Sequence, residues 1–116
     1  MELTDKDYGT ILEIIRDLDG INPNAGVQIK FTDGGFTLYY IAAENIDYKD
    51  SPLYRECMEI GNKRLNDVEK ELKSQFKEET GKALAFDKVD EREDLEIMSP
   101  ALQRYYLRIF RTFELK

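Results

Sequence analysis

One long helical pattern places the strongest constraint on the fold of this chain. Ser51 and Pro52 begin it, because serine caps a helix N-terminus and proline fits the first helical turn. Gly81 suits its end. Between them an apolar seam recurs at helical spacing: Tyr54, Met58, Gly61, Leu65, Val68, Leu72 and Phe76. About 29 helical residues rise about 43 Å, which exceeds the usual span of a small domain.

The second half of this seam needs a covering element. We predict that Leu65, Val68, Leu72 and Phe76 are buried, because each such side chain gains about 1.5–3 kcal/mol on leaving water. Two arrangements satisfy the prediction. The seam packs against the C-terminal segment of the same chain, or it forms a homodimer through the central helix.

Two further patterns precede the long helix. Residues 4–19 predict a helix, with Thr4 as its cap and apolar residues at helical spacing. Residues 27–43 predict a β-hairpin, since apolar and polar residues alternate on both sides of a glycine-containing turn. Tyr39 and Ile41 lie on the outer face of the second strand, so that face is either covered or used for binding.

The remainder of the chain is ambiguous between helix and strand. Residues 83–89 indicate a short third strand, and residues 87–96, with six acids against two bases, indicate a solvated loop. In the C-terminal segment Ser99 and Pro100 repeat the helix-starting pair, and the aromatic residues follow a helical stripe. As a strand, the same segment would place Arg111 on an otherwise apolar face. We therefore predict a C-terminal helix, with a strand as the alternative.

These patterns together predict a single α+β domain over residues 1–116. A small antiparallel sheet, made of the hairpin and one or two further strands, packs with an N-terminal helix, the long central helix and the C-terminal segment. No apolar run approaches the roughly 18 residues that span a bilayer, and the acidic N-terminus lacks the apolar stretch of a secretory signal. Cys57, the single cysteine, fits a reducing compartment. We expect a cytoplasmic protein without a membrane partner.

The residue types that most catalytic sites require are scarce. The chain has no histidine, which removes the usual general base and leaves Cys57 without a histidine partner. One cysteine and no histidine exclude the usual zinc sites, and no phosphate-binding glycine motif occurs. We expect no enzymatic activity, no cofactor and no metal.

Two groups of residues are candidate binding surfaces. One is an acidic patch, which suits a protein partner with a basic surface because carboxylates can imitate nucleic-acid phosphates. It consists of Asp87, Asp90, Glu91, Glu93, Asp94 and Glu96. The alternative group comes from two segments: Tyr39 and Ile41 on the outer face of the hairpin, and Arg104, Arg108 and Arg111 in the C-terminal segment. These arginines lie beside aromatic residues, a combination that can stack bases and contact phosphates.

The charge distribution favours the acidic patch. The net charge is −7, with −10 over residues 1–98 and +3 over residues 99–116. An acidic body repels phosphate backbones, so nucleic acid is not the expected partner. The leading hypothesis is a non-enzymatic acidic protein-interaction domain, such as a phage-type inhibitor that occupies a basic nucleic-acid-binding site on its partner. The alternatives are a self-associating assembly or chaperone-like module and a nucleic-acid binder that uses the C-terminal segment.

In size, acidity and order of elements the chain resembles small phage-encoded inhibitors such as anti-CRISPR proteins. The layout of helix, hairpin, helix and acidic segment carries this resemblance. No motif accompanies it, and it assigns no role to any residue.

Overall fold

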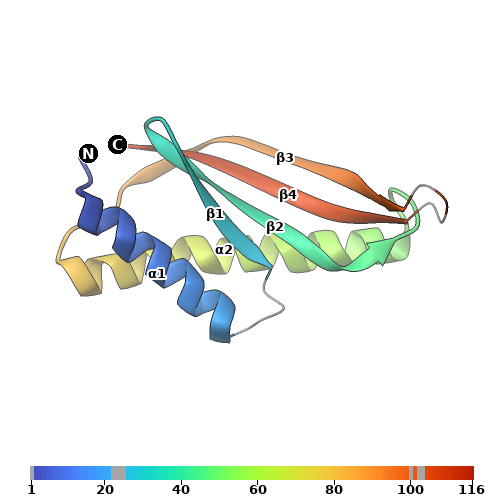
Figure 1. Cartoon of the computed structure of the whole chain (residues 1–116), viewed down its shortest axis with the longest axis horizontal. Helices are drawn as coiled ribbons and strands as arrows, with labels where there is room; N and C mark the ends of the chain where they lie inside the picture. Colours follow the sequence, from blue (N-terminus) through green and yellow to red (C-terminus); the bar gives the residue numbers. More distant parts are fainter. Residues whose placement is uncertain (1, 22–25, 100, 102–103) are drawn as a thin grey trace.

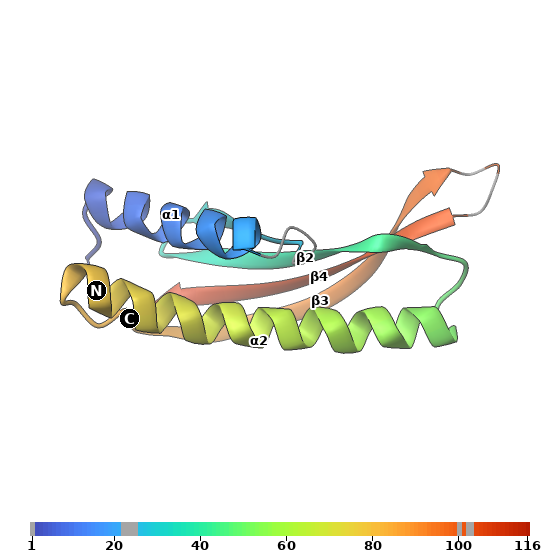
Figure 2. The same ribbon diagram turned by 90° about the horizontal axis from the view of Figure 1, so that it is seen from below.

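The computed structural model describes residues 2–21, 26–99, 101 and 104–116 and has two layers. The described elements are α1 (Asp5–Ile21), β1 (Val27–Thr32), β2 (Gly35–Ile46), α2 (Pro52–Thr80), β3 (Phe86–Ser99) and β4 (Arg104–Leu115). The four strands form one antiparallel sheet in the order β1-β2-β4-β3. Both helices lie along the same side of this sheet, and seen from below they stand in front of it (Figures 1 and 2).

The predicted C-terminal helix is wrong, because this segment is strand β4. It lies between β2 and β3 and pairs with both. Leu107, Ile109 and Phe113 point toward the helices and are 0–2% exposed. Ser99, the expected cap, is the last residue of β3, and Pro100 lies outside the described residues. Hydrogen-bonded neighbours on both sides outweigh the local preference for a helix start.

The solvated loop predicted over residues 87–96 is also wrong. These residues belong to β3, and the short strand expected at 83–89 begins only at Phe86. Acidic side chains are tolerated here because β3 is an edge strand whose described side chains are mostly exposed. Nearby cations also offset the charge, as in the 2.6 Å ion pair between Lys88 and Glu91.

The predicted burial of the α2 seam is confirmed, and it occurs within one chain. Leu65, Leu72 and Phe76 are 0% exposed and Val68 is 7% exposed. Strands of 12 to 14 residues extend about 40–46 Å at about 3.3 Å per residue, which matches the length of the helix. The molecule is accordingly elongated, at 49 × 27 × 20 Å. Because the sheet covers these four side chains, they leave no apolar seam for a second chain.

A glycine permits the close approach of α2 to the sheet. A Cβ atom at Gly61 would lie 2.5 Å from Cδ1 of Tyr40 and 2.7 Å from Cδ1 of Ile109. Both neighbours are themselves buried, at 4% and 1% exposure. The side chains of a packed core have little room to move away from an added methyl group.

We therefore expect Gly61→Ala to lower the free energy of unfolding. Overpacking costs about 1–3 kcal/mol and should exceed the gain of about 1 kcal/mol that alanine brings to a helix. Urea unfolding measures the difference. Ser74→Ala, at an exposed position of α2, is the control and should leave stability equal or slightly higher. A Gly61→Ala variant more stable than the wild type would contradict this packing.

The start of α1 is tied to the end of α2 through Asp7. Thr4 and Asp7 form a capping box: the Asp7 amide donates to Thr4 Oγ1 at 3.1 Å, and the Thr4 amide donates to Asp7 Oδ2 at 3.0 Å. Lys82, just beyond α2, donates to the same Oδ2 at 2.8 Å. The Lys82 hydrogen bond, followed by that from the Thr4 backbone, lowers the pKa of Asp7 below its ordinary value of 3.8.

A lowered pKa makes the contribution of Asp7 dependent on pH. The folded state favours the carboxylate, so its stabilising effect is complete above the unfolded pKa and is lost as pH falls through the folded pKa. Asp7→Asn should therefore be less stable than the wild type near pH 7, and the difference in melting temperature should narrow toward pH 3. Asp17→Asn, an exposed change on the same helix, should follow the wild-type profile. A difference that stays constant with pH would exclude this role of Asp7.

Candidate functional site

The face of the sheet opposite the helices is the main candidate surface. Strand alternation places Tyr39 and Ile41 on this open face, and their partners in β4 are Phe110 and Arg108 respectively. No described helix or strand covers these four residues, which are each partly exposed. Two segments that are separate in the sequence, the outer side of the hairpin and the arginine–aromatic segment, are thus brought together by the pairing of β2 with β4.

An aromatic pair lies near the centre of the open face. The rings of Tyr39 and Phe110 stack with their centroids 6.0 Å apart and an interplanar angle of 28°. The Tyr39 hydroxyl donates a hydrogen bond of 2.6 Å to Oε1 of Gln28 on β1. Beside them the hydroxyls of Thr37 and Thr112 lie 3.1 Å apart. These contacts hold the two rings in place without burying them.

Two arginines flank Phe110. The guanidinium carbons of Arg92 and Arg108 lie 5.1 and 5.3 Å from the centroid of its ring, within cation–π range. Arg108 also donates two hydrogen bonds of 2.7 Å to Asp94 and forms a 2.6 Å ion pair with Glu96. The Asp94 hydrogen bonds raise the pKa of Arg108 above its ordinary value. The cation is therefore held in a fixed orientation, and its charge is offset by two carboxylates.

These side chains form one group on the open face, the aromatic patch. Its members are Tyr39, Ile41, Arg92, Arg108 and Phe110. Sequence reasoning singled out three of them as an alternative binding surface but counted Arg92 only as a base within an acidic loop. The pairing of β3 with β4 brings Arg92 into this group, because Arg92 lies directly opposite Phe110. The sequence alone does not reveal this pairing.

Arg111 does not belong to the open face. Its side chain is 5% exposed and lies between β4 and α2, where it forms an ion pair of 2.5 Å with Glu69. It also donates to Oδ1 of Asn66 at 2.6 Å, to Oδ1 of Asn62 at 3.0 Å and to Glu91 at 3.2 Å. This arginine thus joins α2 to two strands and is not available to a phosphate. The side chain of Arg104, the third predicted arginine, lies outside the described part of the chain.

Loss of Arg111 should be costly. Arg111→Met leaves the acceptors of Glu69, Asn62 and Asn66 without their donor, and removing one member of a buried pair costs up to about 3–5 kcal/mol. Thermal or urea unfolding measures this loss. Arg108→Met, three residues earlier on the same strand, removes a partly exposed ion pair and should cost about 1 kcal/mol or less. Equal costs for the two variants would contradict the structural role of Arg111.

The predicted acidic patch is divided between the two faces of β3. Asp87, Asp90, Asp94 and Glu96 are in register with open-face residues, whereas Glu91 and Glu93 pair with Arg111 and Ile109 on the helix side. Cations of the same chain contact four of the six: Asp87, Glu91, Asp94 and Glu96. The hydrogen bond from Lys88, assisted by the charge of Arg111, lowers the pKa of Glu91. Among the ion pairs of the described residues, none involves Asp90 or Glu93.

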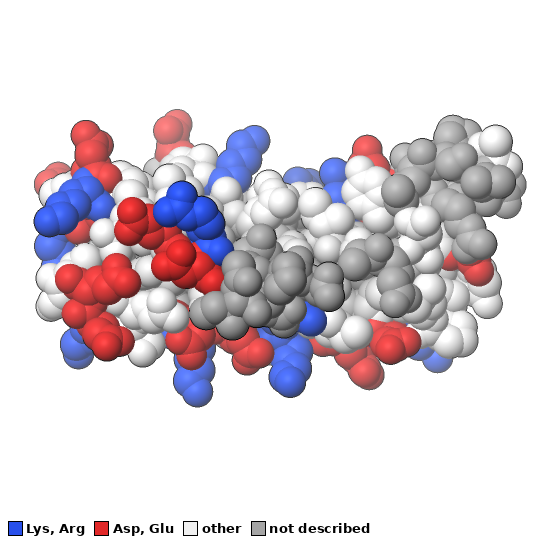
Figure 3. Space-filling model, turned by 60° about the horizontal axis from the view of Figure 1, so that its bottom comes forward, with Lys and Arg blue, Asp and Glu red and all other residues white. Residues whose placement is uncertain are grey.

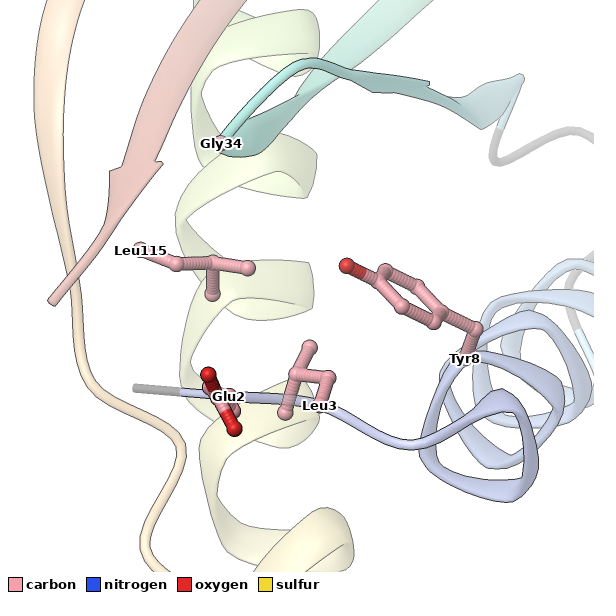
Figure 4. Close-up of a pocket in the computed structure, with 5 residues that line it drawn as sticks. All are labelled: Glu2, Leu3, Tyr8, Gly34 and Leu115. Carbon is pink, nitrogen blue, oxygen red and sulfur yellow. The ribbon is translucent and has the colours of Figure 1, made fainter.

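The hollows described on the remaining surface are shallow. One of about 410 Å³ lies between the N-terminal segment, the hairpin turn and the end of β4 (Figure 4). Glu2, Leu3, Tyr8, Gly34 and Leu115 line it, and the Tyr8 hydroxyl points across it toward the leucines. This lining combines one carboxylate and one phenol with apolar carbon and includes no lysine or arginine.

Charge on the helix side is mixed. Figure 3 shows acidic and basic side chains interspersed over the described surface of that side, without a continuous basic area.

Among the described residues no group of three or more acidic or cysteine side chains is placed to hold a metal ion. The described helices are too short or too polar to cross a bilayer. No family model, curated protein or solved structure matches this chain.

Proposed function

We propose that this chain is a non-enzymatic protein-interaction domain whose interface is the open face of the sheet. The observation that carries the proposal is the aromatic patch, an ordered group of rings and guanidinium groups on a face that no described helix or strand covers. Tyrosine and arginine are enriched among the residues that dominate protein–protein binding energies. Because Tyr39 and Arg108 are already held by hydrogen bonds, these two side chains would lose little further conformational entropy when a partner binds.

Electrostatics supports a protein partner with a basic surface. Among the sheet residues whose side chains the structure describes, five acids and three bases share the open face: Asp87, Asp90, Asp94, Glu96 and Glu114 against Lys30, Arg92 and Arg108. Lys116, which follows β4, contacts Asp87. An acidic surface repels phosphate backbones, and it speeds association with a cationic protein. Occupation of a basic, nucleic-acid-binding site on that partner, as by a phage-type inhibitor, is the form of this function that we favour.

The two other functions have less support from the geometry. Self-association through α2 would need an exposed seam, whereas Leu65, Val68, Leu72 and Phe76 are buried within the single chain. Nucleic-acid binding through the C-terminal arginines would need free guanidinium groups, whereas Arg111 is buried and Arg108 is paired with two carboxylates. The buried thiol of Cys57 is compatible with action in a reducing compartment such as the cytoplasm.

Photo-crosslinking in the native host tests the open face as an interface. A photoreactive amino acid at Lys30 or Glu114, at the margin of the open face, should give adducts with a protein. The same amino acid at Glu78, on the exposed surface of α2, is the control and should give none. Adducts with nucleic acid, or protein adducts at Glu78 alone, would refute the proposal.

Substitutions then measure the contribution of the aromatic patch. We expect Phe110→Ala to weaken binding of the crosslinked partner at least 30-fold, because truncation of a central aromatic side chain commonly costs about 2 kcal/mol or more. Leu12→Ala, at a 49% exposed apolar position of α1, should leave affinity unchanged. Unfolding curves confirm that both variants are folded. An unchanged affinity for Phe110→Ala would exclude the aromatic patch from the interface.

A further inference from the structure

One edge of strand β3 is paired with no described strand. The strand order places β3 outermost, and β4 alone among the described strands pairs with it. Figure 1 shows it along the outer margin of the sheet, on the side away from α1. Backbone N–H and C=O groups along such an edge are a template on which another extended segment can add as a strand.

A regular stretch of this edge is long enough to pair with a peptide. The register of β3 with β4 shifts between Lys88 and Asp90 and again between Ile97 and Ser99. Between these irregularities, residues 90–97 follow β4 without interruption. A ladder of eight residues exceeds the usual strand length of five or six. The bulge at exposed Val89 limits pairing on one side, as bulges do at sheet edges.

The charge of this edge determines which kind of segment can pair with it. Residues 87–96 hold six acids against Lys88 and Arg92, a local charge of −4. A second copy would bring the same acidic strand against it, and like charges directly opposite each other are destabilising. A cationic segment would instead find Asp90 on the open face and Glu93 on the helix side, both exposed.

From these observations we infer that residues 90–97 of β3 bind an extended, lysine- or arginine-rich segment of a protein as a fifth strand. The inference rests on the proposed function, because it states how the partner of the open face would extend onto the adjoining edge. Main-chain hydrogen bonds supply affinity, and cross-strand contacts with Asp90 and Glu93 select basic side chains. The mode of recognition differs from that of the aromatic patch, which acts through side chains alone.

An eight-residue peptide of threonines with lysine at its third and sixth positions is the probe, because this spacing matches Asp90 and Glu93 and places one lysine on each face of the added strand. We expect it to bind the full chain and to slow amide hydrogen exchange within residues 90–97. Two N-methylated forms, altered at odd or at even positions, separate strand addition from charge attraction. Only one set of amides in an added strand faces β3, so one form should lose at least tenfold in affinity and the other should bind nearly as the parent. Equal binding by both forms, or no binding by the parent at millimolar concentration, overturns the inference.

Charge variants provide the second arm of the test. Asp90→Asn with Glu93→Gln should weaken peptide binding several-fold while leaving the unfolding curve almost unchanged. Glu71→Gln with Glu78→Gln removes two charges from the exposed surface of α2 and should have little effect. Equal losses in both double variants would overturn the inference, since they indicate attraction by net charge. Phe110→Ala should not alter peptide binding, so failure of the edge can be distinguished from failure of the open face.

Discussion

The packing of α2 across β2 and β4 is the contact on which the rest of the structure depends. The helix can lie close to the sheet because Gly61 has no side chain opposite Tyr40 and Ile109. Its buried stripe then covers the long strands over most of their length. Because α1 packs on the same side, the two helices together cover the apolar side chains on that face of the sheet. The other face needs no cover for folding, and its aromatic side chains remain available.

Arg111 sets the register of this packing. Its guanidinium group reaches Asn62, Asn66 and Glu69, which follow one another along α2 beside the buried stripe. A shift of β4 by one residue would exchange its two faces, placing Phe110 in the core and Arg111 in solvent. The buried polar cluster opposes such a shift because its members would lose their partners. The composition of the open face is therefore determined partly by an interaction on the opposite side of the sheet.

Local patterns in the sequence predict α1, the hairpin and α2, because caps, turn residues and apolar spacing agree at each of them. They do not predict β4, since its aromatic residues satisfy both a helical and an alternating pattern. Arg111 counted against a strand only because its partners on α2, 42 to 49 positions away, could not be recognised. The acids of β3 similarly resembled a loop because three of their cations, Arg108, Arg111 and Lys116, come from β4 or from the residue that follows it. Tyr39 and Arg108 were identified separately, but their adjacency follows only from the pairing of β2 with β4.

The strand order also has a consequence for how the chain folds during synthesis. β4 is the last of the six described elements to leave the ribosome, yet it lies inside the sheet and joins β2 to β3. Until β4 emerges, β2 exposes one edge and β3 has no paired strand. During this time α2 has only part of the apolar sheet surface on which it packs. Such non-local pairing slows folding and prolongs the exposure of unpaired edges. The dense acidic charge of β3 would keep nascent chains on neighbouring ribosomes from pairing with one another during that interval.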